Sequence, residues 1–170
     1  MQTFNPNRIA VTDANIFIDL FEILWQENLF KIDSEIVTTR EVFNELNDRQ
    51  QESLKKKMQT GQLRVLDILV ADHLSVNAID TSRQLSFSDK TVLYIALRDN
   101  LQVLTGDQKL KKTAEKLGLK ANGILWVFDK LIELHIVTHP EAIEKLESLM
   151  RINSWLPENE IFARLEMWKN

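Results

Sequence analysis

Short apolar runs alternate with longer helical patterns along most of this chain of 170 residues. The runs predict strands near residues 8–12, 35–38, 63–69, 101–105 and 119–121. The helical patterns lie near residues 15–26, 39–60, 72–83, 88–98, 107–117 and 124–134. Strands that alternate with helices favour a parallel sheet with helices on both faces. We therefore expect a three-layer α/β/α fold with a parallel sheet of about four to five strands.

The C-terminal part of the chain predicts helices without further strands. Two amphipathic patterns occur there, one on Ile143, Leu146 and Met150, the other on Ile161, Phe162, Leu165 and Trp168. We expect residues 137–170 to form a helical extension packed on the domain formed by residues 1–136. A chain of this length fits a single domain.

The composition restricts the possible chemistry. The chain has no cysteine, which excludes disulfides, zinc-thiolate sites and cysteine nucleophiles, and a reducing cytoplasm is the expected location. No apolar segment approaches the roughly 20 residues of a membrane span, so we expect no membrane insertion. The formal net charge of −4 disfavours broad, non-specific nucleic-acid binding. It leaves room for a nuclease whose acidic residues are neutralised by metal.

Four acidic residues stand at the positions where a parallel sheet places its chemistry. Asp13 follows the first predicted strand, Asp107 follows the fourth, and Asp89 begins the helix that leads into the fourth. Glu45 lies on the helix after the second strand. Ligands of such sheets bind beyond the carboxyl ends of the strands. All four side chains could therefore converge at one end of the sheet.

Converging carboxylates would need a cation. Like charges within a few ångströms cannot all stay ionised unless protonation or a positive ion relieves them. Mg²⁺ or Mn²⁺ binds such oxygen ligands while keeping several waters. A metal-bound water is a nucleophile, and the metal stabilises charge on a phosphoryl oxygen. The four acids thus point to metal-dependent hydrolysis of phosphate esters.

A purely structural interpretation of each acid stays open. Asp13 and Asp107 could cap the helices that follow them, since acids are common at helix starts. Asp89 could form a capping box with Ser86, because SFSD matches the pattern. Glu45 could be a solvated helical acid, although it lies too far into its helix to be a cap.

The order of the segments VTDANIFIDL, EVFNEL, LSFSDKTVLYIALRDN and VLTGDQKL resembles the PIN domain. The resemblance covers about residues 8–130, and GILWVFDKLIEL extends it. The last helices look like those of VapC-like toxins. The segment 72–83 has no clear counterpart.

The resemblance implies a metal-dependent endoribonuclease that uses Mg²⁺ or Mn²⁺ held by Asp13, Glu45, Asp89 and Asp107. Asn15 matches the small polar position after the first acid, and Thr105 matches the polar residue before the last acid. The resemblance also implies the toxin of a toxin-antitoxin pair, with RNA as substrate, an antitoxin protein as partner and a homodimer as assembly.

Two other functions remain possible. A haloacid dehalogenase-like phosphatase would use Asp13 as nucleophile. That class requires a second Asp two residues later as acid and base, and this chain has Asn15 at that position. A catalytically silent PIN-fold binding module is the other alternative.

Two lysine groups could contact RNA phosphates. One is Lys55, Lys56 and Lys57; the other is Lys109, Lys111, Lys112 and Lys116. A solvated helical face is the favoured interpretation of both, because Lys commonly coats exposed helices. Lys109 is the better candidate for an RNA contact because it lies close to Asp107.

Overall fold

The computed structural model describes residues 9–32, 36–79 and 84–169. Its strands are short and all their pairings are parallel. They are β1 (Ile9–Thr12), β2 (Ile36–Thr39), β3 (Leu63–Leu66), β4 (Gln102–Leu104) and β5 (Ala121–Asn122). The α/β class and the parallel strands agree with the expectation from sequence.

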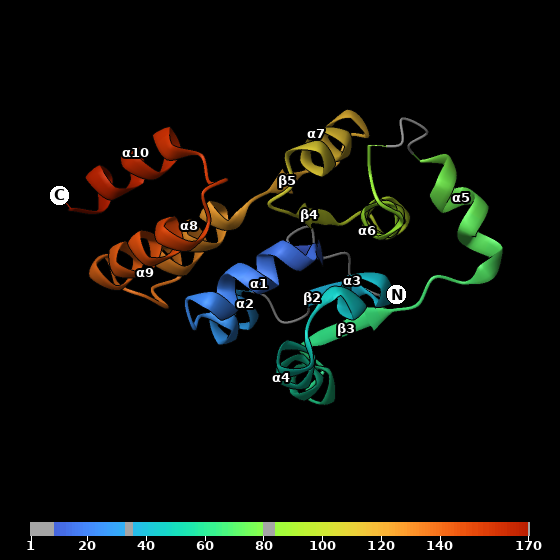
Figure 1. The fold of residues 1–170 in the computed structure, drawn as a ribbon, viewed down its shortest axis with the longest axis horizontal. Coiled ribbons are helices and arrows are strands. Elements are labelled where there is room, and N and C mark those ends of the chain that lie inside the picture. Colours follow the sequence, from blue (N-terminus) through green and yellow to red (C-terminus); the bar gives the residue numbers. More distant parts are fainter. Residues whose placement is uncertain (1–8, 33–35, 80–83, 170) are drawn as a thin grey trace.

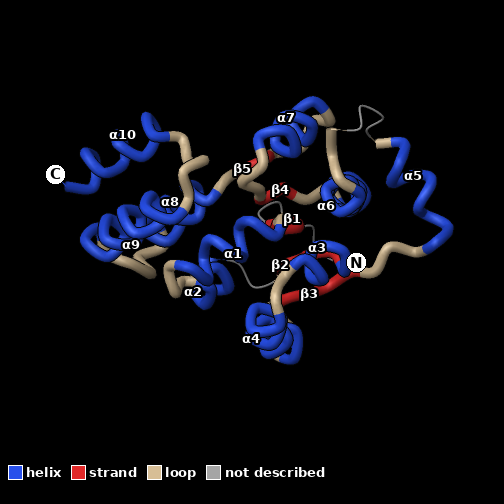
Figure 2. Tube along the Cα trace, in the orientation of Figure 1, coloured by secondary structure: helices blue, strands red, loops and turns tan. Residues whose placement is uncertain are grey.

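The hydrogen bonding of the strands differs from the single sheet that we expected. The described strands form a three-stranded sheet of order β1-β4-β5 and a separate two-stranded sheet of β2 and β3. Figure 2 shows β2 beside β1, and the Thr38 hydroxyl donates a hydrogen bond to the Thr12 carbonyl at 3.1 Å. The two sheets thus meet edge to edge through a side-chain contact.

Helices surround these strands (Figure 1). They are α1 (Ala14–Glu22), α2 (Gln26–Ile32), α3 (Arg40–Glu45), α4 (Asp48–Gln59), a 3-10 turn η1 (Val70–Asp72), α5 (His73–Ala78), α6 (Phe87–Asp99), α7 (Gln108–Lys116), α8 (Ile124–Glu133), α9 (His139–Ile152) and α10 (Glu158–Lys169). Helix α7 lies beside β4 and β5, whereas α4 lies beyond β3 on the opposite side (Figure 1). No described helix is long and apolar enough to cross a membrane.

The helix predicted over residues 15–26 is wrong in its extent. It ends at Glu22, and α2 begins at Gln26. Between them Leu24 adopts a φ of +59°, the Leu24 amide donates to the Phe21 carbonyl, and the Trp25 amide donates to the Leu20 carbonyl. These bonds form a Schellman motif, which usually carries glycine at the left-handed position. Because leucine is not a residue type that usually ends helices, the sequence did not predict the break between α1 and α2.

Two other elements are shorter than predicted. The third strand ends at Leu66 rather than residue 69. In the described part of the segment predicted as one helix over 72–83, α5 follows the 3-10 turn η1 and ends at Ala78. Residues 80–83 lie outside the described part of the chain. Leu69, Val70 and Leu74 are exposed here, whereas Val76 of α5 is fully buried.

The core extends from the strands into the C-terminal helices. The ring of Phe128 on α8 lies 4.9 Å from that of Trp25 and 6.3 Å from that of Trp168 on α10, measured between centroids. All three rings are almost fully buried. Aromatic pairs at these distances bury large areas and add to stability. The Phe128 ring therefore joins α8 both to α10 and to the turn that follows α1.

Candidate functional site

Asp13 is positioned by the end of β1. The pairing of β1 with β4 shifts register between Ile9 and Thr12, which places one extra residue in β1. Beyond the shift, the Asp13 amide donates to the Leu104 carbonyl at 3.0 Å. The Asp13 Oδ1 atom then accepts from the Asn15 amide at 2.7 Å and caps α1. An irregularity of this kind redirects a side chain at the end of a strand.

Thr105 connects Asp13 to the loop that carries Asp107. Its hydroxyl donates to Asp13 Oδ2 at 2.6 Å and accepts from the Asp107 amide at 3.0 Å. Thr105 follows β4 and is 1% exposed. A buried hydroxyl that both donates and accepts holds its partners in one geometry. Thr105 thus links Asp13 to Asp107, and its supporting role in the site stays a prediction.

Asp89 and Asp107 each use one carboxylate oxygen to cap a helix. Asp89 Oδ2 accepts from the amide and the hydroxyl of Ser86 at 2.8 and 2.7 Å, completing a capping box at α6. Asp107 Oδ1 accepts from the amides of Lys109 and Leu110 at 2.7 and 2.9 Å at the start of α7. Within the described residues, neither Asp89 Oδ1 nor Asp107 Oδ2 has a hydrogen-bond partner. Each of these acids therefore keeps one oxygen available.

The pKa of Asp13 depends on its burial and on the charges of Asp89 and Asp107. Burial raises the pKa of Asp13, which is 6% exposed, and the hydrogen bonds from Thr105 and Asn15 oppose that shift. The charges of Asp89 and Asp107 raise the Asp13 pKa further. The charges of two acids from other segments, at the starts of α6 and α7, thus act on the Asp13 carboxylate at the end of β1. A nearby cation would favour their ionised forms.

Glu45 is placed differently from the three aspartates. It is the last residue of α3 and is exposed. Its charge is not among those that raise the Asp13 pKa. One turn earlier on α3, Glu41 is half-buried, and its Oε2 atom is buried without a hydrogen-bond partner in the described structure. The contribution of Glu45 to the site therefore remains a prediction.

A layer of buried threonines lies beneath the aspartates. Thr12, Thr38 and Thr39 at the ends of β1 and β2, Thr91 on α6, and Thr105 after β4 are each at most 1% exposed. The hydroxyls of Thr39 and Thr91 lie 2.9 Å apart in a hydrogen bond, which joins β2 to the helix that Asp89 begins. Of these threonines, only Thr105 was predicted as a site residue. Thr12, Thr38 and Thr39 stand at or next to the carboxyl ends of predicted strands, which is a signal in the sequence, whereas Thr91 lies on a helix and has no such signal.

The aspartates fit a hard divalent cation in ligand chemistry. All their donors are oxygens, and Mg²⁺ and Mn²⁺ prefer oxygen ligands. Among the described residues, however, no three Asp, Glu or His side chains are grouped as a metal site. Each aspartate instead binds groups at the start of a helix: Asp13 and Asp107 accept from the first amides of α1 and α7, and Asp89 accepts from the amide and hydroxyl of Ser86. The structural and the functional interpretations of these acids are therefore compatible.

Asp19 links the helix of the site to the C-terminal helices. Its two carboxylate oxygens accept hydrogen bonds from the Asn153 side-chain amide at 3.2 and 3.0 Å. Burial raises the pKa of Asp19 to about 6, and the charges of Asp13 and Glu22 contribute. Asn153 ends α9, so this contact fixes α9 against the helix that Asp13 caps.

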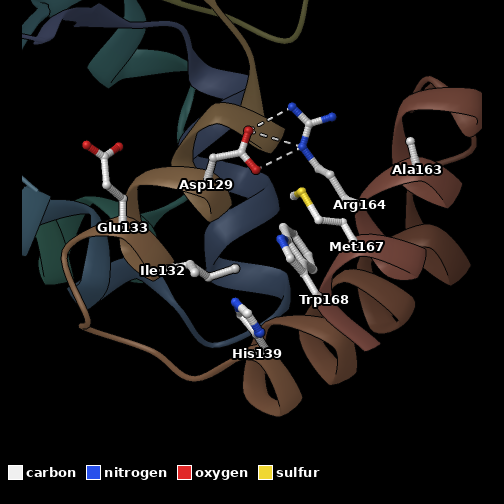
Figure 3. A pocket seen from close by; sticks show the side chains of 8 residues that line it. All are labelled: Asp129, Ile132, Glu133, His139, Ala163, Arg164, Met167 and Trp168. Carbon is white, nitrogen blue, oxygen red and sulfur yellow. Dashed lines mark hydrogen bonds and ion pairs between the residues drawn. The ribbon is translucent and has the colours of Figure 1, made fainter. Parts of the chain in front are cut away.

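The described structure also contains a pocket of about 530 Å³ away from the aspartates. It lies between α8, α9 and α10, lined by Asp129, Ile132, Glu133, His139, Ala163, Arg164, Met167 and Trp168 (Figure 3). Arg164 closes one side by binding Asp129, with an N–O distance of 2.7 Å. None of the predicted site residues lines this pocket. It is a seam between C-terminal helices rather than part of the candidate site.

Comparison with known proteins supplies the family. The crystal structure of PAE2754 from Pyrobaculum aerophilum is similar to this chain, with a TM-score of 0.50 and 17% identity over 76% of this chain and 94% of that one. This likeness supports the fold alone. No curated protein matches the chain.

A family model, DUF3368, described as a PIN domain, matches residues 9–170. PIN domains are generally nucleases and typically use divalent metals. Because the match extends over nearly the whole sequence, the chain belongs to the PIN domain family.

Proposed function

We propose that this PIN domain is a metal-dependent endoribonuclease that hydrolyses RNA phosphodiester bonds. The observation that carries the proposal is the buried Asp13 carboxylate at the end of β1, which the Thr105 hydroxyl connects to the loop of Asp107. Burial raises the pKa of Asp13, and the charges of Asp89 and Asp107 add to that shift. A buried carboxylate with a raised pKa is a candidate for a functional site. Phosphodiester hydrolysis by such a cluster requires no histidine or lysine base.

The proposed metal residues are Asp13, Asp89 and Asp107, with Glu45 as a further ligand. Mg²⁺ or Mn²⁺ would supply an activated water and stabilise charge on the phosphoryl oxygen. Asp13 would bind the ion from its buried position, and the unpartnered oxygens of Asp89 and Asp107 would approach it from the starts of α6 and α7. Thr105 would keep Asp13 oriented, and Asn15 would steady the other Asp13 oxygen through its amide.

The biological setting is a proposal as well. The resemblance to VapC-like toxins supports a toxin role, with a separately encoded antitoxin, a homodimeric assembly and a cytoplasmic location. Lys109 is the proposed RNA contact nearest to the acids, because its backbone amide binds Asp107. We also propose that residues 137–170 act as a helical extension of the nuclease domain, supported by the burial of Trp168 against Phe128.

The second candidate is a PIN-fold module that binds RNA without cleaving it. The observation in its favour is that Asp13, Asp89 and Asp107 all serve as helix caps, which gives each of them a structural function. A module of this kind would not depend on divalent metal for its activity.

Metal-dependent cleavage separates the two candidates. We expect the purified protein to cleave single-stranded RNA with Mn²⁺ or Mg²⁺ and to lose this activity in EDTA. Asp89→Asn should slow cleavage by about 10²–10³-fold, the cost of losing a group that stabilises transition-state charge. Gel analysis of a labelled RNA gives the rates.

Asp48→Asn is the matched control, because Asp48 is an exposed acid in the first turn of α4. That variant should cleave like the wild type. Cleavage that persists in EDTA, or that Asp89→Asn leaves unchanged, would contradict the proposed function.

A further inference from the structure

Helix α7 is strongly basic in an acidic protein. Its nine residues, QKLKKTAEK, contain four lysines and one glutamate, whereas the whole chain has a formal net charge of −4. The helix packs on the rest of the protein through Leu110 and Ala114, which are fully buried. Its remaining surface is therefore a local concentration of positive charge.

Three of these lysines form one row, which we call the α7 lysine row. Lys109, Lys112 and Lys116 are exposed and are spaced by three and four residues. Residues with this spacing share one face of a helix. With a rise of 1.5 Å per residue, the row extends over roughly 10 Å along the helix. A linear row of cations matches a linear series of phosphates.

The α7 lysine row forms no ion pair within the described structure. No ion pair there involves Lys109, Lys112 or Lys116. The other lysine group behaves differently, because on α4 Lys55 pairs with Glu52 at 3.4 Å and Lys57 pairs with Glu27 at 2.5 Å. The two lysine groups thus differ in their acidic neighbours.

The row also begins beside the candidate site. Asp107 caps α7 through the amides of Lys109 and Leu110, so the first lysine of the row lies within one turn of an acid of the site. Helix α4 lies on the other side of the strands (Figure 1). Cations on α7 can therefore act next to the carboxylates, whereas those on α4 cannot.

We propose that the α7 lysine row binds the phosphate backbone of single-stranded RNA next to the bond that is cleaved. The inference rests on the proposed ribonuclease function and adds the surface that holds its substrate. Phosphate contacts by lysine position a nucleic acid and give affinity without sequence information. The row gives an acidic protein one attractive path for a polyanion, directed toward its carboxylates.

The test is RNA binding in EDTA, which separates binding from cleavage. Binding of a fluorescent oligouridylate is followed by anisotropy at several salt concentrations. The triple variant Lys109→Ala, Lys112→Ala, Lys116→Ala should bind at least about tenfold more weakly than the wild type. Its slope of log K against log salt should be shallower by about 2, since each phosphate contact on a single strand contributes about 0.7. The triple replacement by arginine should keep most of the binding.

Lys56→Ala is the matched control, since Lys56 is also an exposed lysine but lies on α4. It should bind like the wild type. Unchanged affinity and slope in the triple alanine variant would overturn the proposal, as would a wild type that does not bind the RNA or that prefers duplex DNA.

Cleavage of the same RNA in Mn²⁺ distinguishes this inference from the proposed function. A wild type that binds through the row but does not cleave would refute the ribonuclease and leave the row as an RNA-binding surface. A wild type that cleaves, with a triple alanine variant that binds and cleaves equally well, would refute the row and leave the ribonuclease.

Discussion

Asp13→Asn should reduce metal-dependent RNA cleavage by at least about 10³-fold, equivalent to about 4 kcal/mol of transition-state stabilisation. Asp13 is the buried centre of the site, and its pKa is raised by burial and by Asp89 and Asp107. Asparagine keeps the size of the side chain and can still accept from the Asn15 amide, but it lacks the charge that a divalent ion needs. Single-turnover cleavage of a labelled RNA measures the loss.

The same substitution should raise the melting temperature at neutral pH in the absence of metal. The folded-state pKa of Asp13 lies above its ordinary value, so the folded protein bears a cost when Asp13 is ionised. This cost is largest above the folded pKa and disappears as pH falls below the unfolded value. Asparagine removes the charge at every pH. The gain in stability should therefore be greatest at neutral and alkaline pH and should vanish in acid.

Loss of activity together with a gain in stability separates a functional acid from a structural one. If Asp13 served only to cap α1, its substitution would leave the stability of the protein unchanged or lower it, and RNA cleavage would follow the amount of folded protein. An Asp13→Asn variant that cleaves at the wild-type rate would contradict the role proposed for Asp13.

Thr105→Val should destabilise the protein by about 1–3 kcal/mol and slow cleavage by about 10–100-fold. Valine matches threonine in shape but removes the hydroxyl that donates to Asp13 and accepts from the Asp107 amide. The buried Oδ2 atom of Asp13 then lacks the hydrogen bond that the Thr105 hydroxyl donates. The Asp13 pKa should rise further, which weakens metal binding because the proton competes with the ion. Chemical denaturation and cleavage at varied Mn²⁺ concentrations measure both effects.

A change in the Mn²⁺ dependence of cleavage, beyond a loss of stability, would identify Thr105 as a positioning residue. The Mn²⁺ concentration at half-maximal rate should rise in Thr105→Val, and Thr105→Ser should restore it by returning the hydroxyl. Thr60→Val is the control, because the Thr60 hydroxyl is exposed at the end of α4, away from the acids. If Thr105→Val lowered stability but left the Mn²⁺ dependence unchanged, the hydroxyl would have only a structural role.

Local signals explain why much of the fold was predictable. Thr39 is a residue type favoured at N-caps, and it caps α3 by accepting a hydrogen bond from the Val42 amide. The pattern SFSD permits a capping box of Ser86 and Asp89, and both of its bonds are present. Gly61 is a residue type favoured after helices, and it adopts a φ of +74° just after α4. In each case a few neighbouring residues determine the structure, so the sequence pattern was sufficient.

The failures of prediction involve structure that local patterns do not encode. The break after α1 depends on Leu24 in a left-handed conformation with Trp25 buried behind it, and no glycine announces it. The division of the strands into two sheets depends on hydrogen bonds between distant segments. Side-chain contacts across the chain, such as Thr91 with Thr39, are invisible without the fold.

The candidate site was predictable in its aspartates and less so in its surroundings. Asp13, Asp89 and Asp107 stand out in the sequence because they follow or begin recognisable elements, and in the structure the charges of Asp89 and Asp107 raise the pKa of Asp13. The burial of Glu41 and the contact of Thr91 with Thr39 appear only in the folded structure. Glu45 shows the limit of an ordered motif, because an exposed residue at the end of α3 gives no electrostatic sign of membership in the site.

Anomalous diffraction from a crystal soaked in Mn²⁺ tests the central claim most directly. We predict a manganese peak within about 2.5 Å of carboxylate oxygens from Asp13 and at least one of Asp89 and Asp107, the distance range of divalent metal–oxygen bonds. Reaching it requires the free oxygens of Asp89 and Asp107 to turn toward Asp13. A crystal with full manganese exposure and no peak between these three side chains, or with a peak that persists in Asp13→Asn, would contradict the account.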